Sequence, residues 1–379
     1  MNHHKPITGL LVLASTLVLA AQASATSYYF PKFGTPILIG DRLIFAGPGW
    51  ESQRLICINA ESGEKQWDIS DPVKQPHPAC VFDGRLILTV GGDVESLNPT
   101  NRERKVVLKT GFDRCYIREG ASKGLYVSGD RGATPVITAV DPTTWKTLWE
   151  RPGLSRVLAE GSGVLLCEWE TRKPMGGGAL QLLGDGFAGI SMSSGKELWR
   201  LKGPSASWIH GVAVSNYFVL SLGDSVACVR QNDGSTCKKI KVSEYGPGVS
   251  LVENAGRAVV WSQAGARMDF TGRVYALSVP ELTESELFKT DFFPTSHQIL
   301  NDAAVGWSIG RIDTYDMLSG KKLWGGGQWN WHGAANGCIY FSQRDPDAKH
   351  TSVNRIDIRT GALHQLYSEE LPPEMQRKP

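Results

Sequence analysis

A short phrase recurs along this chain, and it constrains the fold more than any other feature of the sequence. It runs from an apolar stretch through Asp or Asn to a Ser/Thr-Gly turn, and it ends a few residues later in tryptophan. The clearest copies are 57–67, 188–199 and 312–324, and the weaker ones are 94–108, 139–149, 229–238, 274–288 and 355–363. Because a repeated unit buries its apolar face only against its neighbours, these copies predict a repeat architecture.

The spacing of the copies identifies the type of repeat. Five of them share a turn glycine, namely Gly63, Gly195, Gly234, Gly320 and Gly361. These glycines give a mean period of about 43 residues, which is typical of a β-propeller blade. Each unit also carries an upstream apolar hairpin with a turn such as Asp83-Gly84 or Asn336-Gly337. The sequence therefore predicts an all-β fold, a single eight-bladed propeller of four-stranded antiparallel blades, with seven blades as the alternative.

The phrase resembles the repeat of the pyrroloquinoline-quinone-type (PQQ-type) propeller family, whose consensus is Ala-Leu-Asp-x-x-Thr-Gly-x-x-x-Trp. The resemblance covers nearly the whole chain after its N-terminal segment. It is specific for the fold and not for function, because the family includes quinoprotein dehydrogenases, a lipoprotein of outer-membrane assembly and many exported proteins. The resemblance implies that the final tryptophans pack between neighbouring blades. We therefore expect a structural docking role for Trp67, Trp149, Trp199 and Trp324.

The N-terminus has the pattern of a secretory signal peptide, predicted over residues 1–25. A basic start is followed by the apolar run 10–20 and by the small residues Ala23-Ser24-Ala25. The apolar run is too short to span a bilayer comfortably, and no long apolar stretch follows it. We therefore expect an exported protein, periplasmic or extracellular, with no membrane span. The propeller is predicted over 26–370, with 28–33 adding a strand to the last blade, and 371–379 is predicted to be a disordered tail.

Charge and cysteine content limit the classes of partner and of covalent link. The chain has 40 basic and 38 acidic residues, and this near-neutral balance argues against a nucleic-acid partner. Of the seven cysteines, Cys228 and Cys237 lie on opposite arms of one expected hairpin and form the candidate disulfide. No Cys-x-x-Cys pattern is present, which argues against a zinc ribbon or a thioredoxin-like site.

Polar residues recur at one position of the blade, where the chain enters the innermost strand, roughly four to six residues before the turn of the inner hairpin. These residues are His77, Arg114, Arg156, His210, His297 and His332. Imidazoles and guanidiniums gathered at the mouth of a propeller funnel would bind an anion, a sugar or a metal. The alternative interpretation is that each histidine separately satisfies backbone groups at the end of its blade. The sequence identifies neither a catalytic residue nor a set of metal ligands.

Two classes of function follow from these patterns. The favoured one is a non-catalytic exported scaffold that binds a protein or peptide partner and needs no cofactor. The alternative is an enzyme with its site in the funnel. The family resemblance suggests a quinoprotein oxidoreductase that uses PQQ and calcium, whereas the histidine pattern suggests a polysaccharide lyase that uses His, Arg or a transition metal. Trp329 and Trp331 offer a stacking surface for a quinone, but the sequence shows no calcium ligands to accompany them.

Overall fold

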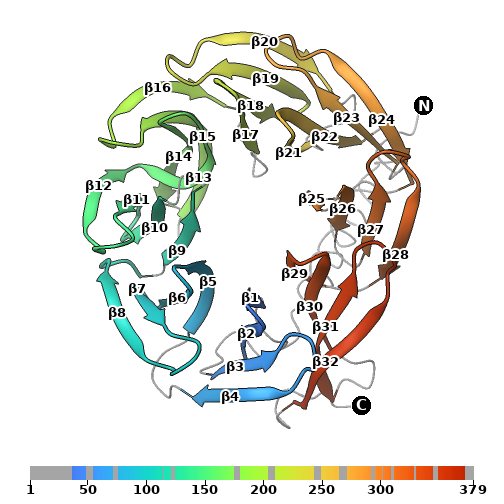
Figure 1. Cartoon of the computed structure of the whole chain (residues 1–379). Helices are drawn as coiled ribbons and strands as arrows, with labels where there is room; N and C mark the ends of the chain where they lie inside the picture. The colour runs from blue at the N-terminus through green and yellow to red at the C-terminus, as the bar shows by residue number, and fades with distance from the viewer. Residues whose placement is uncertain are drawn as a thin grey trace, which may run out of the picture.

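The structure is a computed structural model of the chain. It describes residues 36–47, 54–70, 76–113, 115–120, 124–174, 180–203, 210–242, 249–263, 271–291, 294, 296–300, 302–308, 311–327, 330–344 and 349–371. Strands β1 to β32 form eight four-stranded antiparallel sheets, each built from four consecutive strands. The sheets follow one another around a closed ring (Figure 1). The prediction of an eight-bladed propeller is therefore confirmed, and the seven-bladed alternative is wrong.

Each blade contains four strands in chain order. Blades 1 and 2 contain β1 (Ile37–Ile39), β2 (Arg42–Ala46), β3 (Arg54–Asn59), β4 (Lys65–Ser70), β5 (Pro76–Phe82), β6 (Arg85–Val90), β7 (Asp93–Leu97) and β8 (Arg104–Lys109). Blades 3 and 4 contain β9 (Cys115–Glu119), β10 (Leu125–Arg131), β11 (Thr134–Val140), β12 (Thr147–Pro152), β13 (Leu154–Glu160), β14 (Val164–Pro174), β15 (Leu180–Ser191) and β16 (Glu197–Lys202). Blades 5 and 6 contain β17 (Gly211–Val214), β18 (Tyr217–Leu222), β19 (Ser225–Arg230), β20 (Thr236–Lys241), β21 (Val249–Asn254), β22 (Arg257–Gln263), β23 (Gly272–Leu277) and β24 (Glu284–Thr290). Blades 7 and 8 contain β25 (Ser296–Leu300), β26 (Ala303–Ser308), β27 (Arg311–Asp316), β28 (Lys322–Gly327), β29 (Asn330–Ala335), β30 (Cys338–Arg344), β31 (His350–Asp357) and β32 (Leu363–Glu370).

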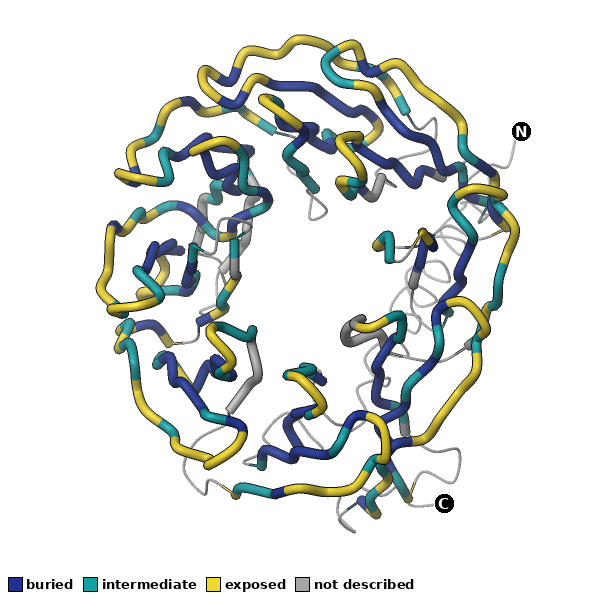
Figure 2. The backbone as a smooth tube through the Cα atoms, viewed as in Figure 1, coloured by how far each residue is buried: buried dark blue, intermediate teal, exposed yellow. Residues whose placement is uncertain are grey.

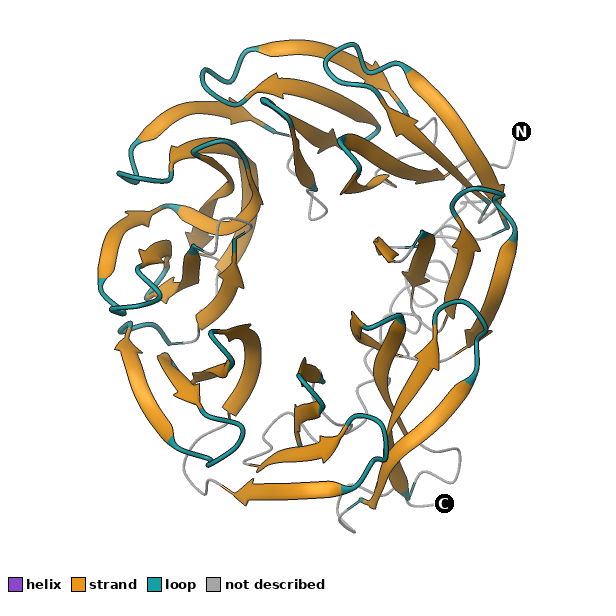
Figure 3. Cartoon of the chain, viewed as in Figure 1, coloured by secondary structure: helices purple, strands orange, loops and turns teal. Residues whose placement is uncertain are grey.

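Burial changes with the place of a strand in its blade. The first strand of each blade lies toward the centre of the ring and the fourth lies on its outside (Figures 1 and 2). Second and third strands such as β2 and β19 are buried along most of their length, whereas the fourth strand β20 is largely exposed. The described residues form strands and connecting loops and no helix (Figure 3), so none of them belongs to a helix able to cross a membrane.

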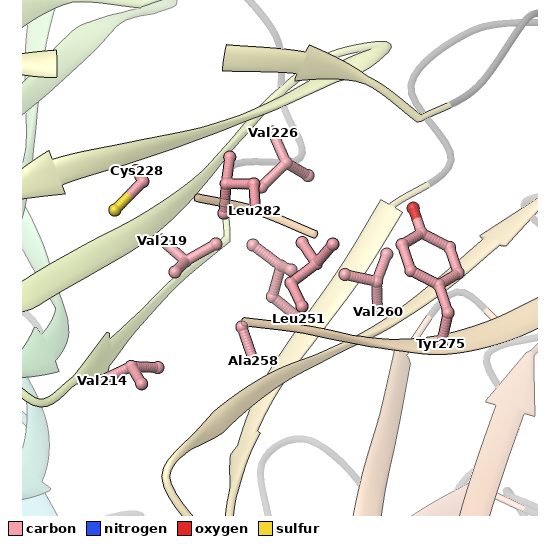
Figure 4. Packing of buried hydrophobic residues seen from close by; sticks show 10 residues of the cluster. Val214, Val219, Val226, Cys228, Leu251, Ala258, Val260, Tyr275 and Leu282 are labelled. Atoms are coloured by element: carbon pink, nitrogen blue, oxygen red, sulfur yellow. The ribbon is translucent and has the colours of Figure 1, made fainter. Parts of the chain in front are cut away.

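The hydrophobic core lies between neighbouring blades. Val219 and Cys228 of blade 5, for example, belong to one cluster with Leu251, Val260 and Tyr275 of blade 6 (Figure 4). Because both faces of a middle strand meet a neighbouring blade, these strands consist of continuous apolar runs instead of alternating ones. The core is therefore divided into clusters around the ring, and each blade depends on the next for its burial.

The four docking tryptophans make the same contact in four blades. Each indole Nε1 donates a hydrogen bond to a carbonyl in the last turn of the next blade: Trp67 to Pro99 (2.9 Å), Trp149 to Met192, Trp199 to Gln231 and Trp324 to Ile358 (2.7 Å each). The first three side chains are buried, and Trp324 is half-buried. The repeated tryptophan thus joins one blade to the turn of its neighbour.

That turn has one backbone conformation in all eight blades. The residue at its end has positive φ in each case, and the eight are Gly63, Arg102, Trp145, Gly195, Gly234, Leu282, Gly320 and Gly361. At Gly195 an added Cβ would come within 2.6 Å of the Trp149 ring, and at Gly234 it would meet the Trp199 ring equally closely, at 2.7 Å. The turn glycine therefore provides both the left-handed conformation and the space for the docking tryptophan.

The ring is closed where blade 8 meets blade 1. Phe45 of blade 1 packs in one cluster with Val353 and Leu366 of blade 8. Beside this cluster, Arg54 forms ion pairs with Asp68 of its own blade and with Glu369 of blade 8, each at 2.5 Å. Side chains of the two blades therefore hold the seam together.

The predicted chain ends can be compared with the structure only in part. The signal peptide 1–25, the closing strand 28–33 and the tail from residue 372 onward lie outside the described residues. Leu371, the first residue of the predicted tail, is buried, and its N–H donates a hydrogen bond to the carbonyl of Lys349 (2.6 Å). The described residues therefore include the first residue of the predicted tail, whose disorder stays a prediction.

The candidate disulfide pair lies at a β-bulge. Cys228 pairs with Lys238 and Val229 with Thr236, so Cys237 is the additional residue of the bulge beside Cys228. Both cysteines are free thiols; Cys228 is buried and Cys237 is exposed. Burial raises the pKa of Cys228 to about 12, and the neighbouring Cys237 raises it as well. The two thiols are therefore neighbours, and their oxidation to a disulfide stays a prediction.

Candidate binding site on the channel wall

The six predicted site residues occupy innermost strands or the residue just before one. His77 lies in β5, Arg156 in β13, His297 in β25 and His332 in β29, and His210 directly precedes β17. Arg114, which comes just before β9, lies outside the described residues, as do the side chains of His77 and His332. Arg156, His210 and His297 are thus the three side chains whose surroundings can be compared.

Two of these three side chains share a pocket. A pocket of ≈ 360 Å³ lies on the inner wall where blades 3 to 6 follow one another, and Arg156 and His210 both line it. Arg118 from β9 and Glu253 from β21 complete its polar lining. The pocket therefore collects one polar side chain from each of four successive blades.

Arg118 reaches the pocket because of the alternation along β9. Cys115 and Ile117 pack toward blade 2, so Tyr116 and Arg118 face the other side of the strand, toward blade 4. The Nη1 atom of Arg118 donates a hydrogen bond to the carbonyl of Val157 in blade 4 (2.5 Å). Water reaches the guanidinium in the channel, but the surrounding walls reduce its hydration and lower its pKa. The Glu160 carboxylate raises this pKa, whereas the charge on Arg156, which lines the same pocket, lowers it.

Arg156 presents its charge to the channel while its partner is buried. Its Nε atom lies 2.5 Å from Oε2 of Glu168. The Glu168 side chain is 11% exposed, whereas that of Arg156 is 49% exposed. The carboxylate therefore lies behind the guanidinium and holds it in place, since an ion pair with a buried partner restricts the longer side chain.

His210 adds a titratable group between the blades. Its carbonyl accepts a hydrogen bond from the N–H of Ser221 (2.9 Å), which extends the β17–β18 ladder by one residue and fixes the backbone. Burial lowers the pKa of the imidazole, and the charge on Arg156 lowers it further. The neighbouring Glu253 is occupied elsewhere, because its Oε1 accepts a hydrogen bond from the N–H of Gly256 in its own turn (2.9 Å).

His297 lies inside the wall and not on its surface. Its side chain is 2% exposed and packs edge-on against Trp261 of blade 6, with 5.5 Å between ring centroids. Among the described residues, neither imidazole nitrogen has a hydrogen-bond partner. Burial lowers the pKa of His297 to about 3, and the charge of a protonated His210 lowers it as well. The structure thus brings Arg156 and His210 together in one pocket and places His297 in the packing between blades 6 and 7.

The pocket is suited to binding an anion. Arginine guanidiniums bind carboxylates and other oxyanions through paired hydrogen bonds, and the neutral imidazole of His210 adds one N–H donor. In the described part of the chain, no group of three or more His, Cys, Asp or Glu side chains is arranged to hold a metal ion. The PQQ-with-calcium and transition-metal alternatives stay predictions.

The sequence pattern missed Arg118 and selected Arg114 in the same segment. Arg114 stands at the entry to β9, the position that the repeat selects, whereas Arg118 lies near the end of that strand. The signal that separates them is the alternation Cys-Tyr-Ile-Arg over 115–118, which places one polar face toward the next blade. That alternation predicts the direction of Arg118 only if the strand is known to begin at Cys115.

Comparisons with known proteins define the class of the protein. No protein-family model and no curated protein matches the sequence. Among solved structures, a eukaryotic initiation factor is similar with a TM-score of 0.54 at 11% identity, covering 92% of both chains. Saccharomyces cerevisiae Sqt1 is similar with a TM-score of 0.54 at 10% identity, covering 91% of this chain and 97% of its own. BamB from Moraxella catarrhalis is similar over 80% of this chain and 84% of its own, at 14% identity and a TM-score of 0.45. Together with the eight sheets, the first two similarities define a β-propeller protein.

Proposed function

We propose that this chain is a non-catalytic binding propeller, exported from the cell, that holds an acidic segment of a partner protein in the pocket of its channel wall. One observation carries the proposal: Arg118, Arg156 and His210, from three successive blades, line the same pocket. Export is supported by the signal-peptide pattern over residues 1–25, which also implies a periplasmic or extracellular location.

The surroundings of the pocket favour a peptide over a small ion. Tyr116 is 69% exposed and lies on the same face of β9 as Arg118, two residues away. Exposed tyrosine beside arginine is typical of the energetically important part of a protein–protein interface. A pocket of ≈ 360 Å³ is at the small end of ligand sites, so it suits one or two side chains of a longer segment. A peptide with one acidic side chain in the pocket and its adjacent residues against Tyr116 would use both the small pocket and the exposed tyrosine.

Binding of a labelled Asp/Glu-rich peptide, followed by fluorescence anisotropy at low and moderate salt, tests the proposal. We expect the Arg118→Gln variant to bind about ten-fold or more weakly, since a hydrogen bond to a charged group contributes roughly 1.5–3 kcal/mol. Arg102→Gln removes an equal charge from the exposed last turn of blade 2 and is expected to leave the affinity unchanged. Equal affinity of the native protein and Arg118→Gln would show that the peptide does not bind in this pocket.

A further inference from the structure

A second pocket lies at the rim of the ring, where blade 4 meets blade 5. Its volume is ≈ 400 Å³, and its polar lining consists of Ser162, Asn216, Tyr217, Arg230, Gln231 and Asn232. It shares no residue with the channel-wall pocket. What it could bind is indicated by a comparison of blade 5 with the other seven blades.

Blade 5 departs from the repeat at the first residue of its last turn, the residue whose carbonyl accepts a hydrogen bond from the N–H of the positive-φ residue. In five blades this residue is Asn or Asp, and its side chain accepts hydrogen bonds from two N–H groups of the turn: Asn59, Asn98, Asp141, Asp316 and Asp357. In two others it is serine. Blade 5 has Arg230, whose side chain carries donors only and cannot cap the turn. A position that gives up a local structural interaction indicates a functional constraint.

The next residue departs from the repeat as well. Seven blades have an apolar residue here, namely Ala60, Pro99, Pro142, Met192, Val279, Met317 and Ile358. Blade 5 has Gln231, which is 4% exposed. Its Oε1 accepts a hydrogen bond from the N–H of Ser162 in blade 4 (2.8 Å), and its Nε2 donates to the carbonyls of Ser215 and Tyr217 in blade 5 (3.0 Å each). Gln231 therefore builds a fixed floor across the two blades.

Gly161 of blade 4 makes room for this floor. A Cβ at that position would come within 2.4 to 2.5 Å of the Gln231 amide group. The glycine and the glutamine are therefore matched to each other across the boundary between the blades, and the pocket is a built feature of this boundary.

The walls of the pocket offer polar groups that the protein itself does not use. Among the described residues, the guanidinium of Arg230, the hydroxyl of Tyr217 and the side-chain amides of Asn216 and Asn232 have no hydrogen-bond or ion-pair partner. Hydrogen bonds from Ser235 lower the pKa of Asp233, and the charge of the nearby Arg230 lowers it further; Oδ1 of Asp233 accepts from the N–H of Ser235 (2.8 Å). By contrast, Arg131 of β10 and Arg273 of β23 are paired with glutamates of their own blades.

We propose that this rim pocket binds a uronic-acid residue of an acidic polysaccharide. Arg230 would pair with the carboxylate of the sugar, since guanidinium and carboxylate match in charge and geometry. The amides of Asn216 and Asn232 and the hydroxyl of Ser162 would bind the ring hydroxyls, and the Tyr217 ring would cover an apolar face of the sugar. An acidic peptide side chain would occupy Arg230 but leave the two amides without partners.

Isothermal titration with digalacturonate, using neutral digalactose as the matched ligand, tests this assignment. We expect the native protein to bind digalacturonate more tightly than digalactose by about ten-fold or more, because a charge-assisted hydrogen bond contributes that difference. Arg230→Gln should remove the preference and Arg230→Lys should restore part of it. Arg102→Gln, with the same charge change on the equivalent turn of blade 2, should leave it unchanged.

The possible outcomes separate this site from the channel wall. Arg118→Gln should leave digalacturonate binding intact, so this proposal and the peptide proposal can fail independently. Equal affinity for the two disaccharides, an affinity that does not respond to Arg230→Gln, or no binding at millimolar concentration would each overturn the assignment. If an Asp/Glu-rich peptide binds in a manner that depends on Arg230 while digalacturonate does not, the rim pocket is a peptide site and the assignment is wrong.

Discussion

The outer part of each blade and the wall of the channel are built according to opposite rules. On the outside, the indole N–H of Trp67, Trp149, Trp199 and Trp324 reaches a carbonyl of the next blade at 2.7 to 2.9 Å each time. On the channel wall, equivalent strands carry different polar side chains from one blade to the next. Stacking requires the same contact at successive boundaries, whereas a binding site requires a difference between them. Repetition therefore indicates structure, and its interruption indicates function.

The largest expected effect comes from breaking an outer contact. Trp199→Ala should lower the free energy of unfolding by about 3–5 kcal/mol, because a buried aromatic side chain is replaced by a cavity. Chemical denaturation followed by far-ultraviolet circular dichroism, which reports on the backbone, measures this change. Leu318→Ala, at a side chain that is 95% exposed, is the control and should shift stability by about 0.5 kcal/mol or less. An unchanged unfolding midpoint for Trp199→Ala would contradict the docking role.

His297 provides an intermediate effect, and it depends on pH. The pKa of its buried imidazole is about 3, below the ordinary value of 6.5, so the folded protein binds fewer protons here than the unfolded chain does. Its stabilising contribution is therefore complete above pH 6.5 and is lost progressively as the pH falls toward 3. Between pH 7 and pH 5 this single group should lower the free energy of unfolding by about 2 kcal/mol.

Denaturation of the native protein and of His297→Leu at both pH values measures that contribution. The variant should lose less stability between pH 7 and pH 5 than the native protein does. His364→Gln, on the exposed outer strand β32, is the matched control and should keep the native pH dependence. Identical pH dependence of the native protein and His297→Leu would mean that the imidazole is not buried in its neutral form.

The smallest expected effect is on the channel wall itself. Arg118→Gln should change the free energy of unfolding by about 1 kcal/mol or less, since it loses one hydrogen bond in a solvent-accessible position. The same variant should lose most of its peptide affinity. A large loss of stability would instead make Arg118 a structural link between blades 3 and 4, and the contrast between wall and outer layer would not hold at this position.

The fold could be predicted from the sequence because the same local requirement is met eight times. Each last turn needs a positive φ, and in five blades a glycine marks it. The turns that end in Arg102, Trp145 and Leu282 have no glycine at this position, so only the period of the repeat predicts where they lie. No single copy of the repeat distinguishes a seven-bladed from an eight-bladed ring, since only the complete ring shows how many sheets are present.

The site could be predicted only in part. Position in the repeat indicates the innermost strand, and the structure has Arg156 in β13 and His210 just before β17. It does not indicate which face of the strand a side chain takes or how deeply it is buried. His297 shares the position but packs under Trp261, and Arg118 reaches the pocket from a position that the pattern did not select. How deeply a side chain is buried and which way it points depend on contacts between blades, and the residues that make these contacts are distant in the sequence.

The seam between blades 8 and 1 has a consequence for engineering. Each described blade consists of four consecutive strands, and side chains link the two blades at the seam through contacts such as the Arg54–Glu369 ion pair. A circularly permuted chain, opened between β16 and β17 and joined by a linker across the present seam, would keep every described sheet intact. It would also place a new end beside His210, which lines the channel-wall pocket, so that a fused reporter would sit next to that pocket and at the other end of the strands from the rim pocket.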